Sequence, residues 1–590
     1  MKQTNTLIYK RNVGQSTFLS MSYRNLFLSL AHLFTMECAI IFIGIILPLS
    51  GLFFYQAFPG TQLSCWLLLP THLLFPGKAM ISPVHDPNAP PASLSIDGQE
   101  TMLLLVGFIA LFTLYLLAIR TLPRYISHRY LLLSTLILGV TYAFIPAITS
   151  QDLFSYIGYA HIGIIYHLNP LTTPPTAIHT DPVYPYIFWV HQPSAYGPLW
   201  VIITSALQWL SLLFGSNHIL SMVLLLRVFG LATHLGSTLL IWHIGGSLQR
   251  WNEVISPHAR LAATLAFAWN PLLLFEACVN AHNDTAILFL ILLALWFLQL
   301  QVRGTRQLYL LAVASLALAA CIKISFLLLA PGILLFLWSQ QPRRINSIVF
   351  ATLAYAGILL LLYVPFWQHG NILQLFQINP GTTRDINSLY DFLIRLYASI
   401  RGKSIPFVSS DTGSPTEITT HRIGTVIFII VYGVICLLPL LTRGIKTLPA
   451  LIRWMALVWF LYCLIGSPWF WPWYIVTFFG LAALLIATSS DATLGLVRLP
   501  IALQLLTFSM LSVYCFFTWW PHIILIPHLP YFQLSYIRGL WVWGVLALAI
   551  NTHFLSRWKD ILFRNKKAKM LPTADNPGDR PPWEASAPII

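Results

Sequence analysis

Long runs of apolar residues recur along almost the whole chain and constrain its fold more than any other feature. A helix of roughly twenty apolar residues is long enough to cross a bilayer. Only 9% of the 590 residues are charged and 57% are hydrophobic, whereas about a quarter of the residues of a soluble protein are charged. A helix satisfies its own backbone hydrogen bonds in lipid, so the sequence predicts an all-α polytopic membrane protein.

The net charge of +15 has a simple explanation in a membrane protein. The basic residues are scattered over the ends of the apolar runs and form no patch, which argues against nucleic acid as a partner. Lys2, Lys10, Arg11 and Arg24 precede the first run. Because basic residues accumulate on the cytoplasmic side and near anionic lipid headgroups, this cluster places the N-terminus in the cytoplasm.

The apolar runs predict about fourteen spans. They lie near residues 37–55, 101–119, 130–149, 219–244, 261–279, 285–300, a hairpin within 308–338 that turns at Lys323, 348–366, 423–441, 451–465, 474–487, 500–517 and 534–552. The run 198–214 is ambiguous. If it crossed the membrane, later basic segments would fall outside, against the positive-inside rule, so we expect it to be re-entrant or interfacial.

This topology predicts one multi-span unit over residues 1–570, with outer loops at about 57–100, 150–217 and 368–422. No soluble domain or tandem repeat interrupts it. Residues 571–590 are rich in Pro, Asp and Gly and follow a basic segment, so we expect a disordered cytoplasmic tail. The seven cysteines form neither a disulfide framework nor a paired metal spacing.

The loop from Ser150 to Trp200 contains two carboxylates and four histidines but no lysine or arginine. Asp152 directly follows a predicted span and therefore reaches the outer face. A carboxylate at this position is suited to act as a general base that removes the proton of an acceptor hydroxyl. The alternative is an interfacial aspartate that caps a helix starting near Leu153.

A second set of polar residues reaches the same face at other span ends. His282, Asn283 and Asp284 are consecutive, so a turn is needed for all three to contact one ligand, a sugar, a phosphate or half of a metal site; the alternative is a helix cap. Lys323 lies within an apolar run, where it either extends towards the interface or binds a phosphate.

Further along the chain, Arg384 is a candidate phosphate ligand, or else forms a surface pair with Asp385. Trp473 and Tyr474 belong to an aromatic segment that suits either the membrane interface or stacking against a sugar or an isoprenoid chain. Glu276 lies inside a predicted span and is expected to be paired or hydrogen-bonded, but the pattern assigns it no role. No combination has the spacing of a zinc site.

The first loop resembles that of a known enzyme family. Its residues are Asp152, Tyr156, Gly158, Asn169-Pro170, Asp181, Trp189 and Tyr196-Gly197-Pro198-Leu199-Trp200. Together with the later Asn270-Pro271, His282-Asn283-Asp284, Lys323 and Pro472-Trp473-Tyr474, they are similar to the motifs of bacterial polyprenol-phosphate-mannose-dependent α-1,6-mannosyltransferases of the GT-C type. The Asp-x-Asp pattern of other GT-C enzymes is missing around Asp152.

The resemblance implies a GT-C bundle with a large first outer loop, a polyprenyl-phosphate sugar donor and an inverting displacement without a required metal or other cofactor. It implies Asp152 as the base and Lys323 as a phosphate contact. The substrate-binding residues it leads us to expect are Tyr156, Asn169, Tyr196, His282, Asn283, Asp284, Lys323, Arg384, Trp473 and Tyr474.

The sequence thus predicts a membrane glycosyltransferase that moves a mannosyl-type sugar from a polyprenyl phosphate to an extracytoplasmic glycan or glycolipid, in a bacterial-type plasma membrane. Another GT-C sugar, such as arabinose, stays open because a fold does not determine the substrate. A lipid-linked glycan flippase is the second hypothesis. It requires a polar path with deep charges, for which only Arg227 and Glu276 are candidates.

Overall fold

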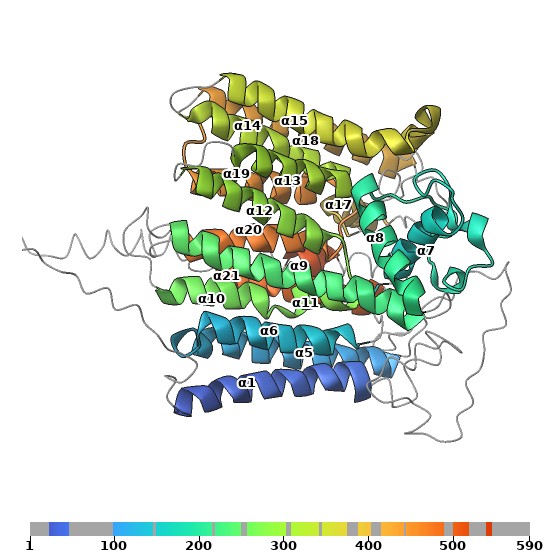
Figure 1. Ribbon diagram of the computed structural model, residues 1–590. Coiled ribbons are helices and arrows are strands. Elements are labelled where there is room, and N and C mark those ends of the chain that lie inside the picture. The colour runs from blue at the N-terminus through green and yellow to red at the C-terminus, as the bar shows by residue number, and fades with distance from the viewer. Residues whose placement is uncertain are drawn as a thin grey trace, which may run out of the picture.

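The computed structural model describes residues 23–46, 98–145, 149–150, 152–214, 219–248, 257–302, 308–340, 345–374, 387–402, 415–441, 444–488, 499–517 and 539–544. Apart from one β-bridge between Asn387 and Trp469, these residues form helices, turns and irregular segments. Figure 1 shows the long helices lying side by side, with α7 and α8 gathered at one end of the bundle. The prediction of an all-α chain is confirmed.

The bundle contains helices of very different length. The long or strongly apolar ones are α1 (Tyr23–Ile41), α5 (Gly98–Thr121), α6 (His128–Ala143), α9 (Ile219–Leu248), α10 (Pro257–Ala268), α12 (Asp284–Val302), α13 (Leu308–Ile322), α14 (Ala330–Ser339), α15 (Ile345–Tyr363), α18 (Pro415–Leu441), α19 (Leu448–Leu461), α20 (Tyr474–Thr488) and α21 (Leu499–Phe517). The shorter ones are α7 (Asp152–Ile164), α8 (Pro198–Ser211), α11 (Pro271–Leu274) and α17 (Leu389–Ile400).

Seven helices among the described residues are long and apolar enough to cross a membrane, or eight if one bent pair counts as a single span. Five shorter apolar helices accompany them. These helices are typical of an integral membrane protein. The expectation of about fourteen spans stays a prediction.

Two helices differ from the predicted spans. The first begins at Tyr23 and is apolar enough to span through Gly44, so the run expected near 37–55 starts about four helical turns after the real one. Glu37 is half-buried within this helix. The run expected at 261–279 is bent by 47°, since Pro271 lacks an amide hydrogen and Asn270 caps α11.

Lys323 interrupts the long apolar run as the hairpin prediction requires. It has extended backbone angles (φ −146°, ψ 115°) between α13 and the 3₁₀ turn Ile324–Leu329 that leads into α14. Ser339, at the end of α14, accepts a hydrogen bond of 2.9 Å from the Ile445 amide, far from Lys323. Lys323 therefore lies at the turn of a helical hairpin.

The helices begin and end at two opposite ends of the bundle. The end at which α7 and α8 lie is called the site end; the opposite one is the far end (Figure 1). Contacts at the far end include Arg260 Nε to the Trp242 carbonyl (2.8 Å), Gln299 Nε2 to the Ile244 carbonyl (3.2 Å) and Gln340 Nε2 to the Lys446 carbonyl (3.3 Å). The helix ends that flank the basic segments 249–256, 303–307 and 341–344 therefore lie at the far end.

Helix α8 begins and ends at the site end. Its N-cap Gly197 donates a backbone hydrogen bond of 2.8 Å to the Ile322 carbonyl, next to Lys323. Near its other end, Gln208 donates to the Met222 carbonyl in the first turn of α9 (3.2 Å). With 14 residues, α8 is about 21 Å long, and α9 then runs from the site end to the far end.

Several sequence predictions lie outside the described residues. These are nearly all of the outer loop 57–100, the loop residues 375–386 with Arg384, most of the span expected at 534–552, and the tail 571–590.

Candidate active site

Asp152 is the first residue of α7, at the site end of the bundle. The Ser150 hydroxyl accepts a hydrogen bond from its amide (3.2 Å), and a carboxylate in the first turn interacts favourably with the helix dipole. The Asp152 side chain is 13% exposed. It is therefore held firmly but can still be reached from outside the protein.

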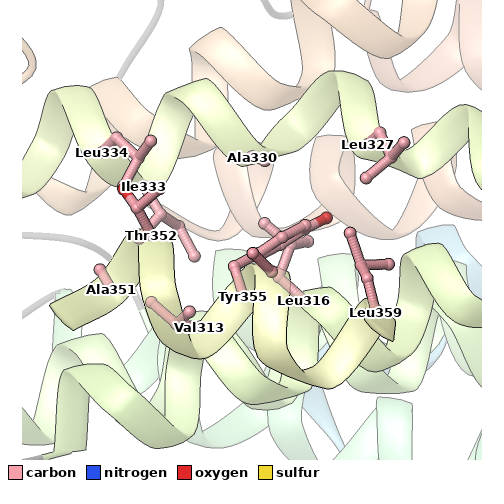
Figure 2. Close-up of a pocket in the computed structure, with 11 residues that line it drawn as sticks. Val313, Leu316, Leu327, Ala330, Ile333, Leu334, Ala351, Thr352, Tyr355 and Leu359 are labelled. Atoms are coloured by element: carbon pink, nitrogen blue, oxygen red, sulfur yellow. The ribbon is translucent and has the colours of Figure 1, made fainter. Parts of the chain in front are cut away.

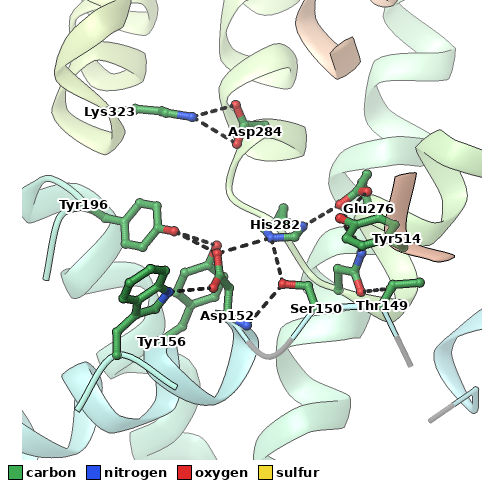
Figure 3. Close-up of polar contacts among 12 residues, drawn as sticks. Thr149, Ser150, Asp152, Tyr156, Tyr196, Glu276, His282, Asp284, Lys323 and Tyr514 are labelled. Carbon is green, nitrogen blue, oxygen red and sulfur yellow. Dashed lines mark hydrogen bonds and ion pairs between the residues drawn. The ribbon is translucent and has the colours of Figure 1, made fainter. Parts of the chain in front are cut away.

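Three side chains surround the Asp152 carboxylate (Figure 3). Trp189 Nε1 donates to Oδ1 (3.2 Å), the Tyr196 hydroxyl donates to Oδ2 (3.2 Å), and His282 Nε2 lies 3.5 Å from Oδ2. An ionised carboxylate has about four acceptor positions. The described side chains occupy three of them, so among these residues Oδ1 keeps one position for a hydroxyl donor from outside.

The Tyr196-Gly197-Pro198 motif has a separate structural reason at each position. Tyr196 contacts Asp152, and Pro198 opens α8 at a position where its missing amide hydrogen costs nothing. A Cβ atom on Gly197 would lie 2.2 Å from the Cys321 carbonyl oxygen. Only glycine allows this approach, which brings the Asp152 loop against the turn that carries Lys323.

Tyr156 lies one helical turn after Asp152 and packs against Tyr196. Its hydroxyl donates to the Tyr196 hydroxyl (3.4 Å), and its ring packs edge-on against those of Tyr196 and Trp200, with centroids 5.0 and 5.3 Å apart. Burial and the Asp152 carboxylate raise the pKa of Tyr196 well above its ordinary value. Tyr196 therefore stays a neutral phenol that donates to Asp152.

His282 lies between two carboxylates. Its Nδ1 is 2.5 Å from Glu276 Oε2 and its Nε2 is 3.5 Å from Asp152 Oδ2, with Trp473 stacked on the ring at a centroid distance of 4.1 Å. Burial alone would lower the pKa of His282, but Glu276 and Asp152 raise it to about 9. The imidazole is therefore positively charged at neutral pH.

The turn predicted for residues 282–284 is present. Glu276 lies in the π-helical turn Phe275–Val279, and Ala281 has a left-handed backbone (φ 52°), which is uncommon for a residue other than glycine. The His282 amide returns to the Glu276 carbonyl (2.8 Å). This fold of the chain turns His282 towards Asp152 and Asp284 towards Lys323.

Asp284 is the first residue of α12 and forms an ion pair with Lys323. Lys323 Nζ lies 3.3 Å from Asp284 Oδ1 and 3.8 Å from the centroid of the Tyr474 ring. Asp284 is 39 residues away from Lys323 along the chain, so the fold alone brings this carboxylate to the lysine. The Lys323 side chain is 14% exposed, whereas that of Asp284 is 1% exposed.

Two of the expected substrate-binding residues lie apart from this group. Asn169 donates to the Phe366 carbonyl (2.9 Å) and accepts from the Leu171 amide (3.0 Å), so it fastens the loop to the end of α15. Asn283 is fully buried, and its amide group has no hydrogen-bond partner among the described residues. Arg384 lies outside the described residues.

The structure adds residues that the sequence did not single out for the site. Trp189 belongs to the resembling loop but was not expected to touch Asp152. Tyr514 of α21 donates to Glu276 Oε1 (2.9 Å), and Asn280 donates to Glu276 Oε2 (3.1 Å). The only signal for the Glu276 network was a carboxylate within an apolar run, which is costly to bury without partners.

The described residues contain no group of three or more His, Cys, Asp or Glu side chains arranged to hold a metal ion. Asp152, Glu276 and Asp284 instead face two cations, His282 and Lys323. This arrangement can accept a proton at Asp152 and can present a positive charge at Lys323.

Residues 81–339 match the family described as alpha-(1->6)-mannopyranosyltransferase, N-terminal domain. This part of the chain belongs to that family. Membership implies a glycosyltransferase of the mannosyltransferase class, and the resemblance read from the motifs is confirmed. No curated protein and no solved structure that was compared with the chain matches it.

The segment that matches the mannosyltransferase family contains most of the site. Asp152, Glu276, His282, Asp284 and Lys323 all lie between residues 81 and 339. Trp473, Tyr474 and Tyr514 come from helices beyond the matched segment and complete the surroundings of His282, Lys323 and Glu276.

Proposed function

We propose that the protein transfers a mannosyl-type sugar from a polyprenyl-phosphate donor to an extracytoplasmic glycan or glycolipid, with Asp152 as the general base. The observation that carries this proposal is the partly exposed Asp152 carboxylate, which has one open acceptor position in the same polar group as Lys323. An apolar bundle surrounds this group at one end, as a lipid-linked donor requires.

The reaction is a direct displacement. The acceptor hydroxyl gives its proton to Asp152 Oδ1, and its oxygen forms a bond to the anomeric carbon of the sugar. The bond between that carbon and the phosphate oxygen breaks on the opposite side, and its electron pair leaves with the polyprenyl phosphate. The configuration is therefore inverted, and the site stabilises the two charges that develop, one at each end of the reaction.

Lys323 is the group that would meet the phosphate. An ammonium has three N–H donors, and Asp284 accepts from it at 3.3 and 3.5 Å. Because Lys323 is partly exposed, its remaining donors can reach an anion at the membrane surface. Its positive charge would stabilise the leaving phosphate as the bond to the sugar breaks.

An apolar cavity beside the Lys323 hairpin supports a lipid donor (Figure 2). It has a volume of about 200 Å³ and lies between α13, α14 and α15. Its lining residues are Val313, Leu316, Leu327, Ala330, Ile333, Leu334, Ala351, Thr352, Tyr355, Ala356 and Leu359. Leu327 is about one turn after Lys323, so we assign the cavity to the isoprenoid units of the donor that follow its phosphate.

The positions of the basic segments support an extracytoplasmic site. The helix ends next to these segments lie at the far end, opposite Asp152. Since positively charged loops stay in the cytoplasm, the site end then faces outward, in a bacterial-type plasma membrane.

The flippase hypothesis needs deep charges along a transport path, and Arg227 was one of its two candidates. Arg227 Nη1 donates to the carbonyl groups of Ala143 (2.8 Å) and Ile145, at the end of α6. A buried guanidinium that satisfies the last carbonyls of a helix has a structural role. Arg227 is therefore not a charge that lines a transport path.

The test uses the purified full-length protein in lipid nanodiscs, polyprenyl-phosphate-[14C]mannose and a mannan oligosaccharide acceptor. We expect a product that is longer by one labelled residue, and the Asp152→Asn variant should lose at least 10³-fold in kcat while it remains folded. The matched control is Asp391→Asn, a buried aspartate that bonds the Asn387 amide. If the protein transferred a sugar only from polyprenyl-phosphate-arabinose, the proposed sugar would be wrong. Normal turnover in Asp152→Asn would show that Asp152 is not the general base.

A further inference from the structure

Glu276 is a buried carboxylate that the reaction above does not use. Its side chain is fully buried, and both of its oxygens are occupied by protein donors: His282 and Asn280 at Oε2, and Tyr514 at Oε1. Because the side chain is fully buried, a sugar or a phosphate cannot reach it. A carboxylate in such surroundings acts through one of its partners or is purely structural.

We propose that Glu276 is a positioning residue of the site, which holds His282 in one orientation and in its charged form against the Asp152 carboxylate. The proposal rests on the function assigned above. His282 lies between Glu276 and Asp152 (Figure 3). Its Nδ1 is 2.5 Å from Glu276 Oε2, and its Nε2 is 3.5 Å from Asp152 Oδ2. His282 thereby acts on the base rather than on the substrate, since both of its ring nitrogens have protein partners.

The orientation of His282 is determined on three sides. Glu276 accepts from Nδ1, so the other nitrogen points to Asp152. Trp473 stacks on one face of the ring, and the Tyr156 ring approaches it edge-on at 6.3 Å. Asn280, which bonds Glu276, is in turn held by the Thr149 hydroxyl (2.5 Å) just before α7.

The charge of His282 matters because the site is rich in carboxylates. Asp152 on α7, Glu276 in the π-helical turn and Asp284 on α12 are opposed by Lys323 on the hairpin turn. Tyr156 and Tyr514 are the remaining titratable groups around His282 and Glu276. With His282 charged, one negative charge stays uncompensated instead of two, which favours entry of an anionic donor.

The main test compares Glu276→Gln with the parent protein across the pH range. A glutamine can still accept from Tyr514 and donate to His282 Nδ1, which leaves Nε2 protonated towards Asp152 but removes the charge. We expect kcat to fall by roughly 10–100-fold with little change in either KM. The loss of activity at high pH should move from about 9 towards the ordinary histidine pKa of about 6.5.

A second variant separates this role from packing. His282→Gln keeps a donor for Asp152 but cannot titrate, so it should abolish that high-pH limb. The double variant Glu276→Gln/His282→Gln should be no worse than His282→Gln alone, because Glu276 acts through His282. The matched control is His234→Gln on α9, a buried histidine that bonds only the Ala268 carbonyl among the described residues, and its effect should add to that of Glu276→Gln.

Thermal unfolding gives a readout that does not depend on the substrate. Because the pKa of His282 is raised in the folded state, its contribution to stability is complete below about pH 6.5 and is lost as the pH rises through about 9. The unfolding temperature of the parent protein should therefore fall more between pH 7 and pH 9.5 than that of Glu276→Gln. This difference would remain even if the donor proposed above were wrong.

Two results would overturn the proposal. One is a Glu276→Gln variant with a lower kcat but an unchanged pH profile and an unchanged unfolding difference, which would make Glu276 structural. The other is an additive loss in the double variant. Absence of transfer in the parent protein would instead contradict the proposed function and leave the unfolding comparison to decide the role of Glu276.

Discussion

Two carboxylates that lie a few residues apart in the chain, Glu276 and Asp284, each pair with a cation, and the two pairs are built differently. Glu276 and His282 are both fully buried, with 2.5 Å between nitrogen and oxygen, whereas Asp284 and Lys323 are 3.3 Å apart and the lysine is 14% exposed. The first pair has no room for a ligand. The second has a cation at the surface. In the proposed mechanism, the buried pair serves the base and the open pair serves the leaving group.

Among variants of these two pairs, the largest effect should come from breaking the open pair at its cation. Lys323→Met keeps the length and apolar stem of the side chain but removes the charge from above Tyr474. We expect kcat to fall by about 10²–10³-fold, as for loss of a group that stabilises a transition-state charge, in a transfer assay with the polyprenyl-phosphate donor.

The control for that variant is Lys323→Arg, which retains the positive charge. It should recover part of the lost kcat. If Lys323→Met turned over at the parent rate, the open pair would have no role at the leaving group and the contrast between the two pairs would disappear.

A smaller effect is expected in the apolar cavity beside the hairpin. Leu316→Trp would fill part of the cavity between α13 and α15, at a cost of about 1–3 kcal/mol for a ligand that needs the same space. We expect KM for a long-chain polyprenyl donor to rise by roughly 10-fold. A donor with a single isoprene unit should be much less affected, and equal effects on both donors would show that the chain lies elsewhere.

An effect of similar size should follow when one of the hydrogen-bond donors to the Asp152 carboxylate is removed. Trp189→Phe keeps an aromatic ring but loses the N–H group 3.2 Å from Asp152 Oδ1. Loss of one hydrogen bond to a charged group costs about 1.5–3 kcal/mol, so kcat should fall by about 10–100-fold, towards the lower value because Asp152 is partly exposed. Trp209→Phe, at an exposed position on α8, is the matched control and should behave like the parent protein.

The sequence pattern indicated which polar residues would lie in the candidate site. Asp152, His282, Asp284 and Lys323 were predicted from polar residues at the ends of apolar runs and Tyr196 from the family resemblance, and the structure brings them together. The signal existed because a charge next to a spanning helix is costly and is therefore rare. Asn169 shows the limit of this reasoning, since a residue of the same loop fastens the loop to α15 instead.

The sequence by itself determined that this chain is a helical membrane protein, because a lipid environment permits few alternatives for such apolar runs. Its motifs also pointed to the mannosyltransferase family that residues 81–339 match. Only the tertiary structure decided which charges are paired: Lys323 meets Asp284 across 39 residues, and Tyr514 meets Glu276 across 238. Such pairings depend on the left-handed turn at Ala281 and on how the helices pack, and neither has a periodicity that can be read along the chain.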